Sequence, residues 1–356
     1  MKSLQIIGSK TMGGAERWFS RFTEALQRRG DQVHAVVRRG SELDQYHLKD
    51  LAVTALPMRT VWDPLSRLEV SRCIRQVAAP IVQTYMGRAT RLTRIRPGRG
   101  QVHLARLGGY YKLDGYRHAQ GWIGNTRALC DWLVSQGMPA DRVFHIYNFQ
   151  APAPGVDDAA VAALRRVLGL RPDDWALLTP GRFVPFKGQQ YVLEALSRLP
   201  VEIGGRRLRL LMLGDGPLAA ALRAQAQALG IDDRVVWCGW QQDPAAWFHL
   251  ADAVVFPSRE REPFGNVILE AWAFGKPLVA TAFRGAREIA RHGEDSYVVP
   301  CDDADALARG VAEVLSDAAM RSGFVAAGRR RLEQEFSEAV IIHRYRELYA
   351  QAVDWA

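Results

Sequence analysis

Short apolar runs alternate with amphipathic segments along the whole chain. In the first half, the apolar runs predict strands at residues 4–8, 33–37, 53–56, 81–85, 102–106, 121–124 and 143–147. In the second half, they predict strands at 176–179, 208–213, 235–238, 253–256, 277–280 and 296–299. Helical patterns lie between several of them, as at 15–29 and 127–136, and end at glycines. This alternation predicts parallel sheets covered by helices, an α/β fold.

A segment rich in proline and glycine divides the chain near its middle. Residues 148–156 read Asn-Phe-Gln-Ala-Pro-Ala-Pro-Gly-Val and show no apolar periodicity. A length of 356 residues is long for one core. We therefore predict two domains, 1–150 and 151–337, followed by an amphipathic helix at 338–356, whose apolar residues recur at helical spacing.

Bulk composition excludes several protein classes. Hydrophobic residues make up 48% and charged residues 24% of the chain, as in soluble globular proteins. The apolar run Leu4–Ile7 is too short for a signal peptide, and no run approaches the roughly 20 residues of a membrane span. Four cysteines are scattered without metal-ligand spacing, which favours reduced thiols. We expect a cytoplasmic protein.

Charge is unevenly distributed between the two halves. The net charge is +9, but residues 1–150 hold 23 Lys and Arg against 11 Asp and Glu, a net of +12. Residues 151–356 hold 24 against 27, a net of −3. The basic half has three candidate partners: nucleic acid, an anionic membrane surface and an anionic acceptor.

The most informative segment runs from residue 253 to residue 281. A buried strand is followed by the loop Pro257–Gly265, a short helix that ends at Gly275, and a second strand. Such a helix would present its free amides, near Phe264 to Asn266, at the carboxyl edge of a parallel sheet. These amides and the positive end of the helix dipole favour an anion such as pyrophosphate.

Two carboxylates bracket the start of this helix. Glu262 and Glu270 would repel a phosphate, so we expect them to accept hydrogen bonds from sugar hydroxyls, while Pro263 and Gly265 shape the turn. A site that holds both a phosphate and hydroxyl groups is a nucleotide-sugar site. The segment therefore predicts binding of a sugar nucleotide.

The pair Glu262-x7-Glu270, set within Pro-Ser-x-x-x-Glu-Pro-Phe-Gly, resembles the donor-site signature of retaining GT-B glycosyltransferases of family 4, the glycosyl transferases group 1. The resemblance implies two Rossmann-like, doubly wound domains that face a central cleft. It assigns the acceptor to residues 1–150 and the donor to 151–337, and it expects the helix at 338–356 to pack back on the first domain. It also implies transfer with retention from a nucleotide-diphosphate sugar, with UDP the expected nucleotide. We expect no metal or other cofactor, because cationic side chains and the helix terminus can neutralise the diphosphate.

A second element of the same resemblance is Gly-Arg-x4-Lys-Gly at residues 181–188. Arg182 and Lys187 would lie on a strand-to-helix loop, where two cations neutralise a departing diphosphate. Gly214, in the turn Gly-Asp-Gly-Pro, resembles the family turn that backs the donor pocket. Trp240 follows the next strand, where the family contacts the nucleobase; packing by Trp237 and Trp240 is the alternative.

The first loop of the chain argues against a dinucleotide enzyme. Residues 8–17 lack the Gly-x-Gly-x-x-Gly fingerprint, and the second strand ends in Arg38 and Arg39 instead of an acid, which disfavours a nicotinamide dehydrogenase. Gly13 and Gly14 resemble the family's Gly-Gly-x-Glu loop, which faces the donor phosphates; a purely structural turn is the alternative.

The catalytic set implied by the resemblance is Glu262, Lys187, Arg182 and a residue of the first domain. Many relatives place a histidine there, whereas Tyr85 follows the corresponding strand here. We predict Tyr85 in that role and hold His103 as a less favoured substitute. The pair Asp303 and Asp305 is predicted to cap a helix instead of holding a metal.

Five arginines lie within twelve residues, at 88, 91, 94, 96 and 99. A solvated charged loop competes with a clamp for an anionic acceptor or lipid head group, formed by Arg88, Arg91 and Arg94. Aromatic residues are sparse in this run, so we expect no nucleic acid partner.

The segments 84–91 and 107–119 resemble glycosyltransferases of bacterial lipopolysaccharide and surface-polysaccharide assembly. This resemblance implies a glycan or glycolipid acceptor and peripheral contact with an anionic membrane. Two other functions stay open: a GT-B sugar-nucleotide epimerase, and a non-catalytic partner subunit that only binds the sugar nucleotide.

Overall fold

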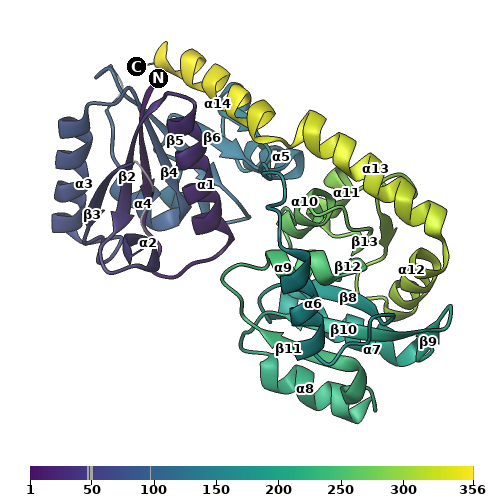
Figure 1. Cartoon of the computed structure of the whole chain (residues 1–356). Coiled ribbons are helices and arrows are strands. Elements are labelled where there is room, and N and C mark those ends of the chain that lie inside the picture. The colour runs from purple at the N-terminus through teal and green to yellow at the C-terminus, as the bar shows by residue number, and fades with distance from the viewer. Residues whose placement is uncertain (46–47, 49–50, 97, 356) are drawn as a thin grey trace. The chain divides into compact units, whose positions relative to one another are not determined.

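The computed structural model describes residues 1–45, 48, 51–96 and 98–355 of the chain. It divides into two compact units (Figure 1). Unit 1 comprises Met1–Asn148 and Glu338–Ala356, and unit 2 comprises Phe149–Ser337. In the described part of the chain, no helix combines the length and apolar character needed to cross a lipid bilayer.

Unit 1 is built on a parallel sheet of seven strands. They are β1 (Lys2–Ile7), β2 (Gln32–Arg38), β3 (Ala52–Leu56), β4 (Ile81–Tyr85), β5 (Val102–Leu107), β6 (Gly121–Gly124) and β7 (Val143–His145). Their order is β3-β2-β1-β4-β5-β6-β7. The order reverses between β1 and β4, which is the switch point of a Rossmann-like sheet.

Helices cover both faces of this sheet. They are α1 (Gly14–Arg28), α2 (Glu42–Gln45), α3 (Pro64–Val77), α4 (Met86–Leu92), α5 (Arg127–Ser135) and α14 (Glu338–Val353). In Figure 1, α1 and α3 lie on opposite sides of the strands. Because both faces are covered, β4 and β5 are buried along their whole length.

Unit 2 repeats this architecture. Its strands are β8 (Trp175–Pro180), β9 (Glu202–Ile203), β10 (Arg206–Leu213), β11 (Val235–Gly239), β12 (Ala253–Phe256), β13 (Leu278–Thr281) and β14 (Tyr297–Val299). The parallel order is β11-β10-β8-β12-β13-β14, and β9 pairs antiparallel with β10. The helices are α6 (Asp158–Val167), α7 (Gln189–Arg198), α8 (Ala219–Ala228), α9 (Ala245–Leu250), α10 (Asn266–Ala273), α11 (Arg284–Ile289), α12 (Ala304–Ser316) and α13 (Ala318–Glu335).

The predicted α/β fold with two Rossmann-like sheets is confirmed. The predicted strands at 81–85, 121–124 and 253–256 have the observed bounds, and the others differ at their ends. The short β9 was not predicted, because two residues are too few to show an alternating pattern. It turns into β10 through Gly204 and Gly205, both with positive φ.

Helix α14, at the end of the chain, completes the core of unit 1. The Tyr349 hydroxyl donates to Gln83 Oε1 at 2.9 Å and accepts from Gln5 Nε2 at 3.1 Å. On the same helix, Arg346 Nε lies 2.8 Å from the buried Asp31. Tyr349 is 1% exposed, so α14 is part of the packed core of unit 1.

Replacing Tyr349 by Phe should destabilise unit 1. The change leaves Gln5 and Gln83 buried without one hydrogen-bond partner, which costs about 1–3 kcal/mol. The loss of unfolding free energy is measured by chemical unfolding, with protease cleavage within α14 as the probe. Gln351→Ala, an exposed change on the same helix, serves as the control. Equal unfolding of both variants and the wild-type protein would show that the polar contacts of α14 add nothing.

Candidate functional site

Three loops at the carboxyl edge of the unit 2 sheet are tied together by their backbones. Gly181 N donates to Leu213 O, Phe183 N to Asp215 O, and Gly214 N to Gly239 O, each at 2.9 Å. Gly214 has a φ of 150°, and a Cβ there would lie 2.1 Å from Gly181 O. A side chain at Gly214 would therefore push the loops after β8 and β10 apart.

The loop after β8 also packs against the loop after β12. A Cβ on Gly188, with a φ of 69°, would lie 2.0 Å from Pro257 O, and Arg259 N donates to Phe186 O at 2.8 Å. This close approach brings Lys187 Nζ to 2.7 Å from Glu262 Oε2. The two side chains are 18% and 9% exposed. Two predicted site residues, 75 positions apart in sequence, thus form a largely buried ion pair.

The turn before α10 is fixed by packing that the sequence analysis missed. Gly265 has a φ of 92°, and a Cβ there would lie 2.6 Å from Phe283 Cζ. A Cβ on Gly285 would lie 2.2 Å from Phe264 O. The rings of Phe256 and Phe283 meet edge to face at 5.2 Å. Phe283 and Gly285 lie at the start of α11, and their contacts with Gly265 and Phe264 fix the turn from which α10 starts. In the sequence, these contacts are marked only by a phenylalanine and a glycine two residues apart.

Glu270 lies one turn into α10, on the same face as Asn266. Its side chain is half-buried, and within the described ranges no residue forms a hydrogen bond or ion pair with its carboxylate. Pro263 is likewise half-buried, in the turn that leads to the helix. The N-cap residue of α10 is Gly265, so no side chain caps the first amides of the helix. A ligand bound at the start of α10 could therefore also reach the carboxylate of Glu270.

Arg182 adds a second cation to this edge of the sheet. Its side chain is exposed, and among the described residues its guanidinium has no partner, while its carbonyl accepts from Gln189 Nε2 at 3.1 Å. The loop thereby presents Arg182 to solvent and Lys187 to Glu262. The two predicted cations and Glu262 lie on neighbouring loops at one sheet edge, and Glu270 lies on α10, which follows one of these loops.

Trp237, within β11, and Trp240, directly after it, differ in environment. Trp240 is 60% exposed and follows Gly239, whose φ is 65°. Trp237 is half-buried between Phe183, at 6.3 Å between ring centroids, and the Arg223 guanidinium, at 4.7 Å. Trp237 is therefore a packing residue, and Trp240 offers an open ring at the carboxyl end of β11.

In unit 1, the glycine loop begins α1. Gly13 is the N-cap, with an extended backbone that any residue adopts, and Gly14 is the first helical residue. A Cβ on Gly13 would lie 3.1 Å from Glu16 Oε2. Because Gly13 has no side chain, the Glu16 carboxylate has room at the carboxyl end of β1.

The structure contradicts the predicted catalytic role of Tyr85. The residue is 1% exposed; its hydroxyl donates to Gln5 Oε1 at 2.9 Å and accepts from Gln83 Nε2 at 2.6 Å. Burial raises the pKa of Tyr85 well above its usual value. Strand alternation explains the error: Tyr85 shares a face of β4 with Gln83, and that face packs under α1 and α14.

His103 is no substitute either. It is 1% exposed, its Nε2 lies 2.9 Å from Thr84 Oγ1, and burial lowers its pKa well below the usual value. The residue is packed within the sheet.

The three predicted clamp arginines differ from one another. Arg88 donates through Nη1 to Met58 O at 2.7 Å and to Arg59 O. Arg91 packs over Gly115, where a Cβ would lie 2.1 Å from Arg91 Nε. Arg94 is exposed and donates to carbonyls of its own loop. Arg88 and Arg91 thus hold the fold together, which corrects their predicted place on an open binding surface; Pro97 lies outside the described residues.

The capping role predicted for Asp303 is confirmed. Its side chain accepts from Ala306 N at 2.8 Å at the start of α12, while Asp305 pairs with Arg198 at 3.4 Å. Across the described ranges, His, Cys, Asp and Glu side chains form no group of three or more arranged to hold a metal ion.

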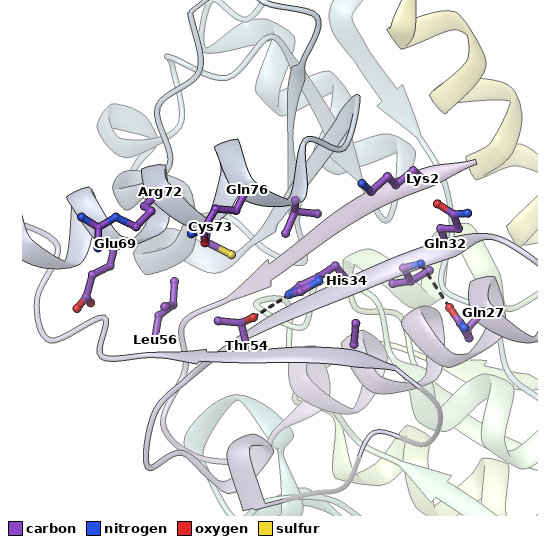
Figure 2. A pocket seen from close by; sticks show the side chains of 13 residues that line it. Lys2, Gln27, Gln32, His34, Thr54, Leu56, Glu69, Arg72, Cys73 and Gln76 are labelled. Carbon is purple, nitrogen blue, oxygen red and sulfur yellow. Dashed lines mark hydrogen bonds between the residues drawn. The ribbon is translucent and has the colours of Figure 1, made fainter.

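Within unit 1, a cavity of about 710 Å³ lies between α3 and the strands β1 to β3 (Figure 2). Lys2, Gln32 and Ala52, from the amino ends of the strands, line it, and His34 Nε2 lies 2.8 Å from Thr54 Oγ1 within it. Ligands of open α/β sheets bind at the carboxyl ends of the strands. None of the predicted site residues lines this cavity.

Comparison with known proteins agrees with this geometry. Residues 161–331, nearly all of unit 2, match the family model described as glycosyl transferases group 1. Over unit 2 the chain is thus similar to this family, which supports a glycosyltransferase. Lipopolysaccharide core biosynthesis glycosyltransferase LpsE of Rhizobium meliloti is 29% identical to this chain over 349 residues, which cover 95% of this chain and 96% of LpsE.

Solved structures show the same fold over the full length. A glycosyltransferase from Rickettsia africae superposes with a TM-score of 0.85 at 18% identity, covering 100% of this chain and 99% of that one. HepE of Anabaena, in complex with UDP and glucose, superposes with a TM-score of 0.83 at 20% identity, covering 99% and 100%. The chain therefore has the GT-B fold.

Gly265→Ala should destabilise unit 2 more than Gly293→Ala. Both residues have positive φ, but a Cβ at Gly293 meets nothing within 4 Å, whereas one at Gly265 overlaps Phe283. The overlap adds about 1–3 kcal/mol to the backbone strain that the two variants share. Chemical unfolding of both variants measures the difference, and equal losses would mean that Phe283 does not fix the turn.

Proposed function

We propose that this protein transfers a sugar from a nucleotide-diphosphate sugar, with retention, to a glycan or lipid-linked acceptor of lipopolysaccharide or surface-polysaccharide assembly. The observation that carries the proposal is the Lys187–Glu262 pair, 2.7 Å apart, beside the start of α10. The name of LpsE supports the acceptor class, and the UDP and glucose bound to HepE support the donor class.

Lys187 and Arg182 would neutralise the departing diphosphate. Negative charge builds on that group as the glycosidic bond breaks, so cations fixed in advance lower the barrier. Lys187 is held by the packing of Gly188 on Pro257 and by Glu262. Arg182 is exposed and approaches from the same loop. The positive end of α10 would add to this stabilisation without a metal ion.

The two carboxylates would bind hydroxyl groups. Glu262 would accept from the transferred sugar and orient it next to Lys187, and Glu270 would accept from the ribose. Gly214 would back the pocket, and the open ring of Trp240 would lie against the base. We propose UDP as the nucleotide, on the likeness to HepE, and no further cofactor.

A thermal-shift screen with UDP-, GDP- and ADP-sugars tests the donor. We expect UDP-sugars to raise the melting temperature of the wild-type protein, because a ligand that binds only the folded state stabilises it. Glu270→Ala should reduce the shift, whereas Arg330→Ala, an exposed arginine of unit 2, should preserve it. No shift with any sugar nucleotide would reject the proposed donor class.

Lys187→Ala should lower turnover about a hundredfold, by analogy with the loss of one preorganised donor. UDP release and glycan formation, measured together with a glycolipid acceptor, report the effect, and Arg330→Ala again serves as the control. Unchanged turnover would remove Lys187 from the mechanism. Interconversion of the sugar nucleotide would favour an epimerase, and donor binding without turnover a non-catalytic subunit.

A further inference from the structure

The backbone of Arg259 is joined to both sides of the Lys187–Glu262 ion pair. Its amide N donates to the carbonyl of Phe186, the neighbour of Lys187, at 2.8 Å, and its own carbonyl accepts from Glu262 N at 2.9 Å. A Cβ on Gly188 would lie 3.5 Å from Arg259 Cγ, so the side chain also packs against the loop that carries Lys187. A displacement of Arg259 would therefore shift both members of the ion pair.

The side chain of Arg259 is held by the loop between β14 and α12. Its guanidinium donates twice to Asp302, from Nε to Oδ1 at 2.7 Å and from Nη2 to Oδ2 at 3.0 Å. It also lies 5.8 Å from the centre of the Tyr191 ring, in the first turn of α7. Burial and the nearby Asp302 carboxylate raise the pKa of Tyr191, so its hydroxyl stays protonated and can donate to that carboxylate. Two parallel hydrogen bonds give the planar guanidinium one defined orientation.

Asp302 has a backbone conformation that glycine adopts most readily. Its φ is 61°, in the left-handed region, where a Cβ crowds the following carbonyl oxygen. Among residues 149–337, all of which the structure describes, it is the only residue other than glycine with a positive φ. Strained residues of this kind cluster at functional sites, where the surrounding contacts hold them in place.

The pair formed by Arg259 and Asp302 contributes little to stability. The two side chains are 39% and 40% exposed. An exposed ion pair raises the ratio of folded to unfolded protein by up to about fivefold. The left-handed conformation of Asp302 lowers that ratio by a comparable factor. The two effects offset each other, so the consequence of the pair is geometrical: it fixes the position of Arg259.

We propose that Arg259 and Asp302 are positioning residues, which hold Lys187 and Glu262 in place for the departing diphosphate and the transferred sugar. This inference rests on the proposed function and deepens it. A misplacement of about 1 Å at a reacting group can lower turnover on the order of a hundredfold, so a small shift of the pair is enough to matter. The alternative is that Arg259 binds the diphosphate directly, in which case Asp302 would matter less than Arg259.

Asp302→Gly removes the carboxylate and the backbone strain together. We expect the free energy of unfolding to stay the same or rise, while turnover falls about tenfold and the KM for the UDP-sugar changes less than about twofold. Chemical unfolding measures stability, and UDP release with a glycolipid acceptor measures turnover. A purely structural role would instead lower turnover only where stability also falls.

Further variants separate positioning from direct binding. Asp302→Asn should restore part of the turnover, because asparagine also adopts the left-handed conformation and its amide oxygen accepts from Arg259. Arg259→Ala should lower turnover by the same factor as Asp302→Gly, and the double variant by no more than either single change. Glu294→Ala, which breaks the exposed pair of Arg291 and Glu294, is the control and should turn over as the wild-type protein does. Losses that add in the double variant would show direct binding by Arg259 and overturn the proposal.

Acylation of Lys187 by an amine-reactive reagent tests the geometry without a substrate. In the wild-type protein its Nζ lies 2.7 Å from Glu262 and the side chain is 18% exposed, so we expect slow labelling. Labelling, followed by peptide mass spectrometry, should be at least about twofold faster in Asp302→Gly and unchanged in Glu294→Ala, because a looser pair opens more often.

The two measurements keep this inference separate from the proposed function. Unchanged labelling of Lys187 in Asp302→Gly overturns the positioning role, as does unchanged turnover of that variant in an active enzyme. Faster labelling in a protein that turns over no sugar nucleotide would support the positioning of Lys187 and contradict only the proposed function.

Discussion

The candidate site depends on the close approach of backbones at the carboxyl edge of the unit 2 sheet. Gly188 lies so near Pro257 O, and Gly214 so near Gly181 O, that no side chain fits between them. This contact joins the loops after β8 and β12 and holds Lys187 2.7 Å from Glu262. A cation and a carboxylate fixed in this way need little reorganisation when charge develops on a leaving group.

The core of unit 1 contains a group of hydrogen-bonded polar side chains. Under α1 and α14, Gln5, Gln83, Tyr85 and Tyr349 form a buried network of hydrogen bonds. Arg106 Nε donates nearby to Tyr345 OH at 3.0 Å, and its guanidinium lies 4.4 Å from the Trp18 ring. Buried polar groups of this kind are costly unless all are paired, so the network requires α14. The end of the chain is thereby built into the first domain.

The basic character of unit 1 also resolves into distinct parts. Arg88 and Arg91 act inside the fold, as donors to carbonyls or as packing over a glycine. Arg67, Arg72 and Arg75 remain on the surface of α3, beside Trp62, Leu65 and Leu68. The run of arginines that begins at Arg88 therefore did not predict the exposed charged surface of unit 1. Half-buried arginines in this run donate to backbone carbonyls or pack against the chain instead of facing solvent.

The sequence by itself determined the alternation of strands and helices, the two sheets and the segment around Glu262 and Glu270, since these follow from local periodicity and turn chemistry. It did not determine which strand face meets which helix. Tyr85 was misjudged for that reason: the face of β4 that carries Tyr85 packs under α1 and α14, and α14 comes from the far end of the chain. Phe283, which sets the turn at Gly265 from 18 residues away, was missed because only tertiary packing brings the two together.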